Sequence, residues 1–406
     1  MSWKHSAIVA LILSATALSG AHAQTPSGKP IRIGFIGEQS GPFSFFGTET
    51  TRAAKLAAEQ LNAAGGLLGR PVEIVDRDSK TLVNDAVRQA RDLLFTENVD
   101  FLMHSISSAE CVAVGNIAKQ AKKIMFSLCA SDDYLGKDGH QYAFRIPNIT
   151  TRTQGFAVGD YVHNTLKAPG RRYYTIANDY AYGRLVTAAF KERILAQEPD
   201  AKFVGESWPK ATESDFTAYI TAMIEAKPDV VFAALGVGIP FWQQAAPFGL
   251  SQKTKIITPA WGGSDEIATL SKDAIPTGAV IGGLPWYAIP GAANEAFVAG
   301  FRKAHNKPPG AAAYLQFVSF QGLRAGIEKA GTTDTNAVIK ALEGLKFDSV
   351  LGPVTIRAFD HQGTTPHWLG KADWDAKLNM GVLTDVTQLP TDSYLLTEDE
   401  VRKLRP

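Results

Sequence analysis

Short apolar runs alternate with amphipathic stretches along this chain, and that alternation restricts its fold more than any other feature. Ile31 to Ile36 is predicted to be a strand, and Thr48 to Ala63 a helix with apolar residues at helical spacing. Val72 to Asp76 and Asn84 to Phe95 repeat the strand and the helix. This β-α-β-α order indicates a parallel sheet covered by helices on both faces.

A second series of the same kind follows Arg145 to Asn148. It contains a predicted strand at Arg172 to Ala177, a helix at Gly183 to Gln197 and a last strand at Lys255 to Thr258. Right-handed crossovers make each series a doubly wound lobe. The fold class is therefore α/β with two doubly wound parallel-sheet lobes, and about 380 residues suffice for two such domains.

The N-terminus has the order of a secretory signal peptide. Lys4 and His5 precede an apolar run from Ala7 to Leu18, and small residues end at Ala23. The run is shorter than the roughly 20 residues of a membrane span. We expect cleavage after Ala23 and a periplasmic mature protein. The alternative is a buried N-terminal helix.

Charge and cysteine content narrow the classes of partner. Lys and Arg number 41 against 40 acidic residues, without the basic clustering of a nucleic-acid surface. The two cysteines, Cys111 and Cys129, fit an oxidising compartment. They form either a disulfide or two small buried thiols, and the sequence leaves both states open.

Enzyme signatures are absent from the sequence. It contains no G-x-S-x-G, Walker loop, H-E-x-x-H or C-x-x-C motif, and its 8 histidines lack zinc-ligand spacing. Gly236 to Gly238 is an incomplete dinucleotide loop, with Phe241 where a third glycine is needed. We therefore expect no enzyme activity, no cofactor and no metal.

The loops that follow the predicted strands carry the residues of interest, because ligands of open α/β sheets bind at the carboxyl edge. Phe43, Phe45 and Phe46 crowd the first loop, where they either pack in the core or contact a ligand. Ser107 and Ser108 open a helix. Hydroxyls and unpaired N–H groups there suit an anion, although a plain N-cap is the alternative.

In the second half, aromatic residues follow the strands. Asn178 to Gly183 reads NDYAYG, and Pro259 to Gly263 reads PAWGG. Leu235 to Pro240 also follows a strand. These aromatic residues either cover the hydrophobic core of the second half or line a cleft between the two halves.

Taken together, these motifs resemble the leucine-binding-protein family, the type I periplasmic receptors of ABC importers, including its branch for aromatic acids. The likeness covers nearly all of the mature chain. It rests on IRIGFIGEQSGPFSFFG from Ile31, LNAAGGLLGRPVEIVDRDSK, SISSAECVAV, IMFSLCASDDYL, DYAYG, FGL and SVLGPVTI. Their order and spacing are specific as a set.

The resemblance implies two lobes joined by three crossovers, near Arg145 to Asn148, Gly282 to Pro285 and Ser349 to Pro353. It places residues 30–146 and 285–348 in the first lobe and 147–284 and 349–385 in the second. Residues 1–23 are the signal peptide and 386–406 a C-terminal extension. A strand pair, Val350 to Ala358 with Trp368 to Trp374, is expected late in the chain.

The resemblance also implies which residues bind the ligand. The family holds a ligand carboxylate with the loop matching Ser107, Ser108 and Ala109, and aromatic residues flank the ligand. The predicted site comprises Phe46, His104, Ser107, Ser108, Ala109, Cys129, Ala130, Ser131, Tyr182, Leu235, Gly236 and Trp261. His104 is either a donor to a ring substituent or a satisfied buried histidine.

One departure from the family bears on the ligand. Amino-acid receptors hold the ligand ammonium with an acidic residue after the last strand of the second lobe. Here Thr258 to Gly263 contains none, and a buried unpaired ammonium costs several kcal/mol. We therefore expect a carboxylate without an α-ammonium, bearing an aromatic ring that stacks on Trp261.

The leading hypothesis is a monomeric binding protein that closes by a hinge on a benzoate- or phenylpropanoid-like acid and delivers it to a membrane permease. One alternative is an amino-acid receptor that uses Asp265, Glu266 or Asp179. Another is an exported amide hydrolase. The sequence does not distinguish transport from a sensory role, nor does it give the ligand's identity and affinity.

Overall fold

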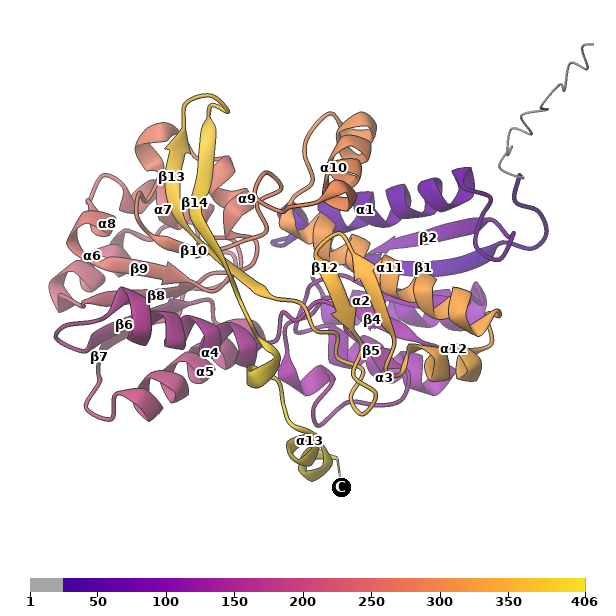
Figure 1. Cartoon of the computed structure of the whole chain (residues 1–406). Helices are drawn as coiled ribbons and strands as arrows, with labels where there is room; N and C mark the ends of the chain where they lie inside the picture. Colours follow the sequence, from indigo (N-terminus) through magenta and orange to yellow (C-terminus); the bar gives the residue numbers. More distant parts are fainter. Residues whose placement is uncertain (1–24, 406) are drawn as a thin grey trace, which may run out of the picture.

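The predicted strands assemble into two sheets, each the centre of one lobe, and the lobes lie side by side (Figure 1). The computed structural model describes residues 25–405. The predicted signal peptide and its cleavage after Ala23 lie outside the described residues. Within residues 25–405, no helix has the length and apolar character needed to cross a membrane.

The first lobe has an all-parallel sheet in the order β2-β1-β3-β4-β5. Its central strands are mostly apolar and buried, with half-buried Arg32 in β1 as an exception, as expected where helices cover both faces. The strands are β1 (Ile31–Gly37), β2 (Val72–Asp78), β3 (Phe101–His104), β4 (Met125–Ser127) and β5 (Ala143–Phe144). The helices are α1 (Ser44–Ala63), α2 (Val83–Arg91), α3 (Cys111–Ala121), α10 (Ala292–His305), α11 (Ala311–Ala330) and α12 (Thr335–Leu342).

The second lobe has a seven-stranded sheet in the order β14-β13-β10-β9-β8-β6-β7. Its β6 to β10 are parallel, whereas β13 runs antiparallel to both β10 and β14. The strands are β6 (Arg172–Ala177), β7 (Lys202–Ser207), β8 (Val230–Ala234), β9 (Lys255–Thr258), β10 (Val280–Gly282), β13 (His367–Asp375) and β14 (Met380–Leu389). The helices are α4 (Thr151–Tyr161), α5 (Ala181–Gln197), α6 (Thr217–Ala226), α7 (Ile239–Ala245), α8 (Leu250–Lys253) and α9 (Gly263–Ala268). The predicted α/β class is confirmed, with an antiparallel edge added.

The predicted late strand pair is wrong. β12 (Gly352–Thr355) pairs with β11 (Lys346–Ser349), and β13 pairs with β14 instead. Short connections bring neighbouring strands together before distant ones, which favours these two local hairpins. Val350, Val354 and Ile356 are buried in the core of the first lobe. The third crossover therefore follows Ile356, later than the expected Ser349 to Pro353.

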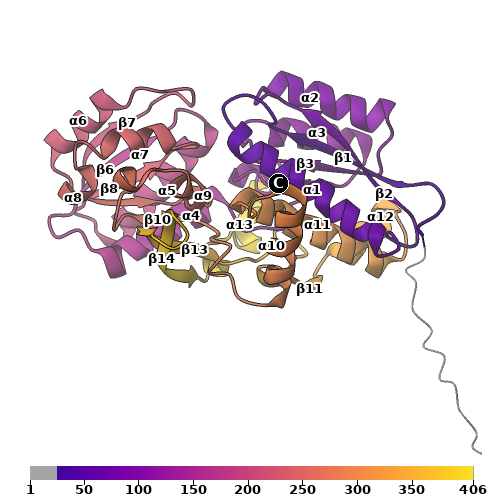
Figure 2. The same ribbon diagram turned by 90° about the horizontal axis from the view of Figure 1, so that it is seen from above.

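The first and third crossovers lie side by side between the lobes and are joined by hydrogen bonds. Gly363 N donates to Arg145 O at 2.7 Å, and Asn148 N donates to Thr365 Oγ1 at 2.8 Å. The second crossover leads from β10 to α10, and α11 then packs along α1 (Figure 2). Arg145 and Gln362 form a parallel bridge, and two backbones joined in this way bend together, which suits a hinge.

The C-terminal segment returns from β14 towards the first lobe and ends in α13 (Glu398–Leu404), beneath the junction of the lobes in Figure 1. Tyr394 donates to Asp160 on α4 at 2.6 Å. Arg405 Nε donates to Gly136 O of the first lobe at 2.8 Å. The expected extension from residue 386 thus starts inside β14 and ends as a tether between the lobes.

Arg145 is the largest fully buried side chain and joins the first crossover to its surroundings. Its Nε donates to Gln362 Oε1 at 2.7 Å, and its Nη1 donates to the carbonyls of Cys129 and Ser131, each at 2.8 Å. Burial lowers the pKa of its guanidinium, which nearby Asp132 counteracts. A buried charge of this kind is retained only where its donors are used.

Substituting Arg145→Met is therefore expected to destabilise the protein by about 3 kcal/mol, because two carbonyls and an amide lose their buried donor. Urea denaturation followed by tryptophan fluorescence measures the change. Arg184→Met, which removes a half-exposed partner of Asp179, is the control and should cost under about 1 kcal/mol. Equal costs for the two variants would contradict the role assigned to Arg145.

Candidate ligand-binding site

A cavity of about 40 Å³ lies where the carboxyl edges of the two sheets face each other. Each lobe contributes residues from three loops that follow strands. The first lobe provides Phe43, Phe46, Ile106, Ser108, Leu128 and Ala130, and the second provides Tyr180, Tyr182, Leu235, Gly236, Ala260, Trp261 and Gly262. We call this space the interlobe cavity.

Two aromatic pairs cross the interlobe cavity from one lobe to the other. The ring centroids of Phe43 and Tyr180 are 5.4 Å apart, and those of Phe46 and Trp261 are 5.2 Å apart. A Cβ on Gly262 would lie 2.4 Å from the Phe46 ring, so only glycine allows this approach. These rings contact one another in the closed arrangement of the lobes.

No aspartate, glutamate, lysine, arginine or histidine in the described chain lines the interlobe cavity. The Tyr182 hydroxyl donates to Gln154 Oε1 at 3.0 Å, whereas the Tyr180 hydroxyl has no partner among residues 25–405. Burial raises the pKa of both phenols, and the charge of Glu38 contributes at Tyr180. Both therefore stay protonated, and Tyr180 offers a free donor.

The serine-rich loop after β3 is only partly free to bind an anion. Glu38, itself buried, accepts from Ser107 N at 2.9 Å and from Ile106 N at 3.4 Å. Within the described residues, Ser108 N and its hydroxyl donate to no protein acceptor. Ser108 is thus the donor that this loop presents to the cavity. The loop offers fewer free donors to a carboxylate than its sequence indicates, because Glu38 accepts from the amides of Ile106 and Ser107.

Seven of the predicted site residues line the interlobe cavity. They are Phe46, Ser108, Ala130, Tyr182, Leu235, Gly236 and Trp261. The other five lie outside its lining: His104, Ser107, Ala109, Cys129 and Ser131. Of these, Ala109 is exposed, and Ser131 uses its carbonyl to accept from Arg145.

His104 is held inside the first lobe rather than presented to the cavity. Its Nδ1 lies 3.0 Å from Ser127 Oγ and its Nε2 lies 3.3 Å from Glu110 Oε2. Burial raises the pKa of neighbouring Glu38, which His104 partly offsets. The geometry matches a satisfied buried histidine and leaves no ring nitrogen for a ligand.

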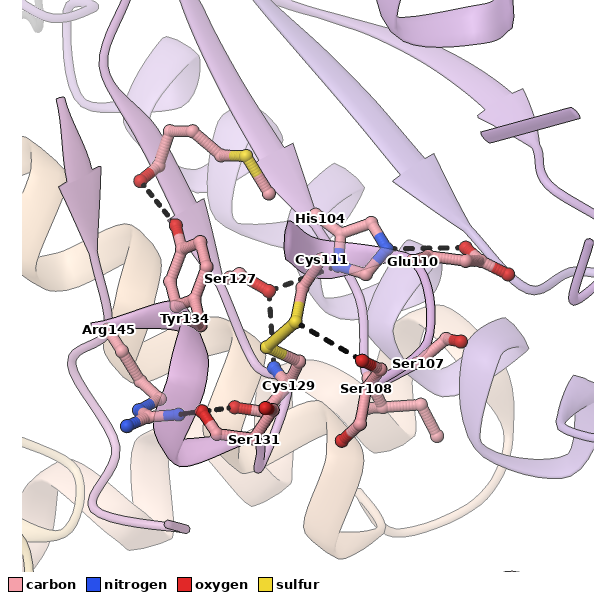
Figure 3. Close-up of a disulfide and its surroundings, with 12 residues drawn as sticks. His104, Ser107, Ser108, Glu110, Cys111, Ser127, Cys129, Ser131, Tyr134 and Arg145 are labelled. Carbon is pink, nitrogen blue, oxygen red and sulfur yellow. Dashed lines mark hydrogen bonds and ion pairs between the residues drawn. A yellow bond between two sulfur atoms is a disulfide. The ribbon is translucent and has the colours of Figure 1, made fainter. Parts of the chain in front are cut away.

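The structure joins Cys111 and Cys129 in a disulfide, the state that the sequence left open (Figure 3). Cys111 begins α3, directly after the serine-rich loop, and Cys129 follows β4. Cys129 N also donates to Ser127 Oγ at 3.2 Å. The bond ties together two loops that carry the cavity residues Ser108 and Ala130.

The acids that an amino-acid receptor would need are engaged elsewhere. Asp265 accepts from Ala311 N at 2.7 Å. Glu266 accepts from Gly238 N at 3.0 Å and Trp242 Nε1 at 3.2 Å, and burial raises its pKa to about 8. Exposed Asp179 pairs with Arg184 at 2.7 Å. None of the three lines the interlobe cavity.

Six lining residues were absent from the predicted site. They are Phe43, Ile106, Leu128, Tyr180, Ala260 and Gly262. All lie within one to three residues of a predicted one, in loops already singled out. A prediction that took in the sequence neighbours of each chosen residue in these loops would have included them.

Comparison with known proteins agrees with this geometry. A family model for periplasmic binding proteins matches residues 30–377. The leucine-, isoleucine-, valine-, threonine- and alanine-binding protein of Pseudomonas aeruginosa is 23% identical over 356 residues, 87% of this chain and 91% of the relative.

Two solved structures share the fold. An amino acid ABC transporter substrate-binding protein from Pseudomonas fluorescens has a TM-score of 0.79 at 22% identity and covers 90% of this chain and 98% of its own. A solute-binding protein from Rhodopseudomonas palustris, in complex with 3,4-dihydroxybenzoic acid, has a TM-score of 0.78 at 23% identity, with coverages of 89% and 98%.

The chain belongs to the leucine-binding-protein-like family of periplasmic binding proteins. It is a solute-binding protein of an ABC transporter, a class that binds a small molecule without converting it, and the family implies a periplasmic location. The amide-hydrolase alternative is therefore overturned.

Removing the disulfide with Cys111→Ala and Cys129→Ala together is expected to lower stability by about 3 kcal/mol, because the bond closes a loop with a sequence separation of 18. Chemical denaturation of the oxidised protein and the double variant measures this. Two thiols titrating with Ellman's reagent in the unfolded, unreduced protein would contradict the bond.

Proposed function

We propose that this ABC-transporter protein captures a small aromatic carboxylate, of benzoate or phenylpropanoid type, in the interlobe cavity. The observation that carries the proposal is the absence of any charged side chain among the described lining residues. An α-ammonium would enter this cavity without an anionic partner, at a cost of several kcal/mol. A carboxylate instead meets the donors of Ser108 and Tyr180.

The proposed site residues are the seven predicted ones in the lining together with the six neighbours. Phe46 and Trp261 provide ring faces, which add about 0.5–1.5 kcal/mol per aromatic contact beyond burial. At about 40 Å³, the cavity holds only a few waters. Entry of a ring therefore requires the lobes to part, and their closure completes binding.

The remaining features of the proposal follow from the class. The mature protein starts after Ala23, acts as a monomer, and delivers its ligand to a membrane permease. The second candidate is an amino-acid receptor, which the named relative and one of the solved structures favour. Isothermal titration calorimetry with benzoate, 3-phenylpropionate and leucine separates the two candidates. Tighter binding of leucine than of both acids would overturn the proposal.

Ala260 provides a charge test, because it lines the cavity next to Trp261 and lies in the segment Thr258 to Gly263, which contains no acidic residue. Ala260→Glu should weaken binding of the aromatic acid at least tenfold, about 1.4 kcal/mol, by repulsion. Ala260→Gln, of equal size and no charge, is the matched control. If both variants weaken binding equally, size rather than charge decides, and an anionic ligand is not supported.

Ser108→Ala removes a hydroxyl that is expected to donate to the ligand carboxylate. Hydrogen bonds to charged groups are worth about 1.5–3 kcal/mol, so affinity should fall roughly 10- to 100-fold. Calorimetry gives the change in affinity, and Ser107→Ala, outside the lining, should leave it within about twofold. Unchanged affinity in Ser108→Ala would move the anion site elsewhere.

A further inference from the structure

A second and larger cavity lies between the lobes, beside the second crossover. Its volume is about 410 Å³, tenfold that of the interlobe cavity at about 40 Å³. Helix α1 of the first lobe and α9 of the second both contribute to it, as do the crossover residues that follow β10. We call it the crossover cavity. Its aromatic lining residues are Phe45, Trp286 and Tyr287, and its charged ones are Glu49, Asp265, Arg52 and Lys307.

One carboxylate oxygen of Glu49 accepts no hydrogen bond from the described chain. The side chain lies in α1 and is only 4% exposed. Its Oε1 accepts from Lys307 at 2.8 Å and from Arg52 at 2.5 Å, whereas its buried Oε2 has no hydrogen-bond partner in the described chain. Lys307 and Arg52 are thus both paired with Glu49 Oε1. The atom on this side of the cavity that lacks a hydrogen-bond partner is the carboxylate oxygen Oε2 of Glu49.

Asp265 supplies a second carboxylate without a cation in contact. It accepts from Ala311 N at the start of α11 and from Ser264 Oγ at 3.2 Å. Burial is the main cause that raises its pKa to about 7; the charge of Glu49 adds to the rise and Lys307 opposes it. Both acids line the crossover cavity. A positive group between them would satisfy both.

Aromatic and apolar walls surround these acids. Trp286 and Tyr287 meet edge to face with ring centroids 5.4 Å apart, and Phe45 comes from α1 of the first lobe. The Arg302 guanidinium already stacks 4.4 Å from the Trp286 ring centroid, which shows that this ring accepts a cation. Prolines and Met380 complete the apolar lining. A cavity with apolar walls and a few convergent polar groups is the usual form of a small-molecule site.

We propose that the crossover cavity is a second ligand site, which binds a small organic ammonium ion with an apolar body. The ammonium lies between Glu49 and Asp265, and the body packs on Phe45, Trp286 and Tyr287. Because α1 and α9 belong to different lobes, an occupant contacts both lobes at once. The site shares no lining residue with the interlobe cavity, so it stands independently of the proposed aromatic acid.

Calorimetric titration of the intact protein with phenethylamine tests the proposal, with 2-phenylethanol as the neutral match. The amine is expected to bind at least tenfold more tightly than the alcohol. Asp265→Asn and Glu49→Gln should each weaken amine binding at least tenfold. Asp265→Asn keeps an acceptor for Ala311 N, and Asp179→Asn, which removes an exposed acid outside both cavities, is the matched control and should change nothing.

The result that overturns the proposal is absence of amine binding, equal binding of the alcohol, or full amine affinity in both variants. Displacement of phenethylamine by excess benzoate would also overturn it, since that places the amine in the interlobe cavity. Benzoate affinity in Asp265→Asn and Glu49→Gln is measured in parallel and should match that of the wild type. Failure of the aromatic-acid proposal therefore leaves this test intact. If Asp265→Asn does not fold by circular dichroism, Glu49→Gln decides.

Discussion

The buried guanidinium of Arg145 connects the first and third crossovers to a loop at the ligand-binding edge of the first lobe. It stands on the first crossover, donates to Gln362 of the third, and donates to the carbonyls of Cys129 and Ser131 in a loop at the ligand edge. A hinge whose strands are fixed to each other and to a site loop moves as one unit. The disulfide then passes that restraint to the serine-rich loop through Cys111.

Much of the architecture could be predicted because it depends on local patterns. Runs such as Ile31 to Ile36 are apolar enough to read as buried strands, and the loops after them fall at one edge by topology alone. Strand pairings could not be predicted where two possible partners compete and the packing of the whole lobe decides between them. The choice of β11 as the partner of β12 rests on which hairpin buries Val354 and Ile356.

The candidate site shows the same division between local and tertiary information. Aromatic residues in loops, such as Phe46 and Trp261, indicated the walls of the interlobe cavity from sequence. The sequence did not indicate that Glu38 occupies the amides of Ile106 and Ser107. That contact depends on two loops far apart in the chain meeting in space. The two cavities also differ in their lining: no Asp, Glu, Lys, Arg or His among the described residues lines the interlobe cavity, whereas two acids and two basic residues line the crossover cavity.

The C-terminal tether has a mechanical consequence. Tyr394 is attached to α4 in the second lobe and Arg405 to the Gly136 carbonyl in the first, so about ten residues bridge the moving halves. A segment held at both ends has a finite reach, and here it is short because α13 (Glu398–Leu404) rises only about 1.5 Å per residue. Rotation of the lobes is therefore bounded by the contour length of this segment, which acts as a stop on how wide the clamp opens.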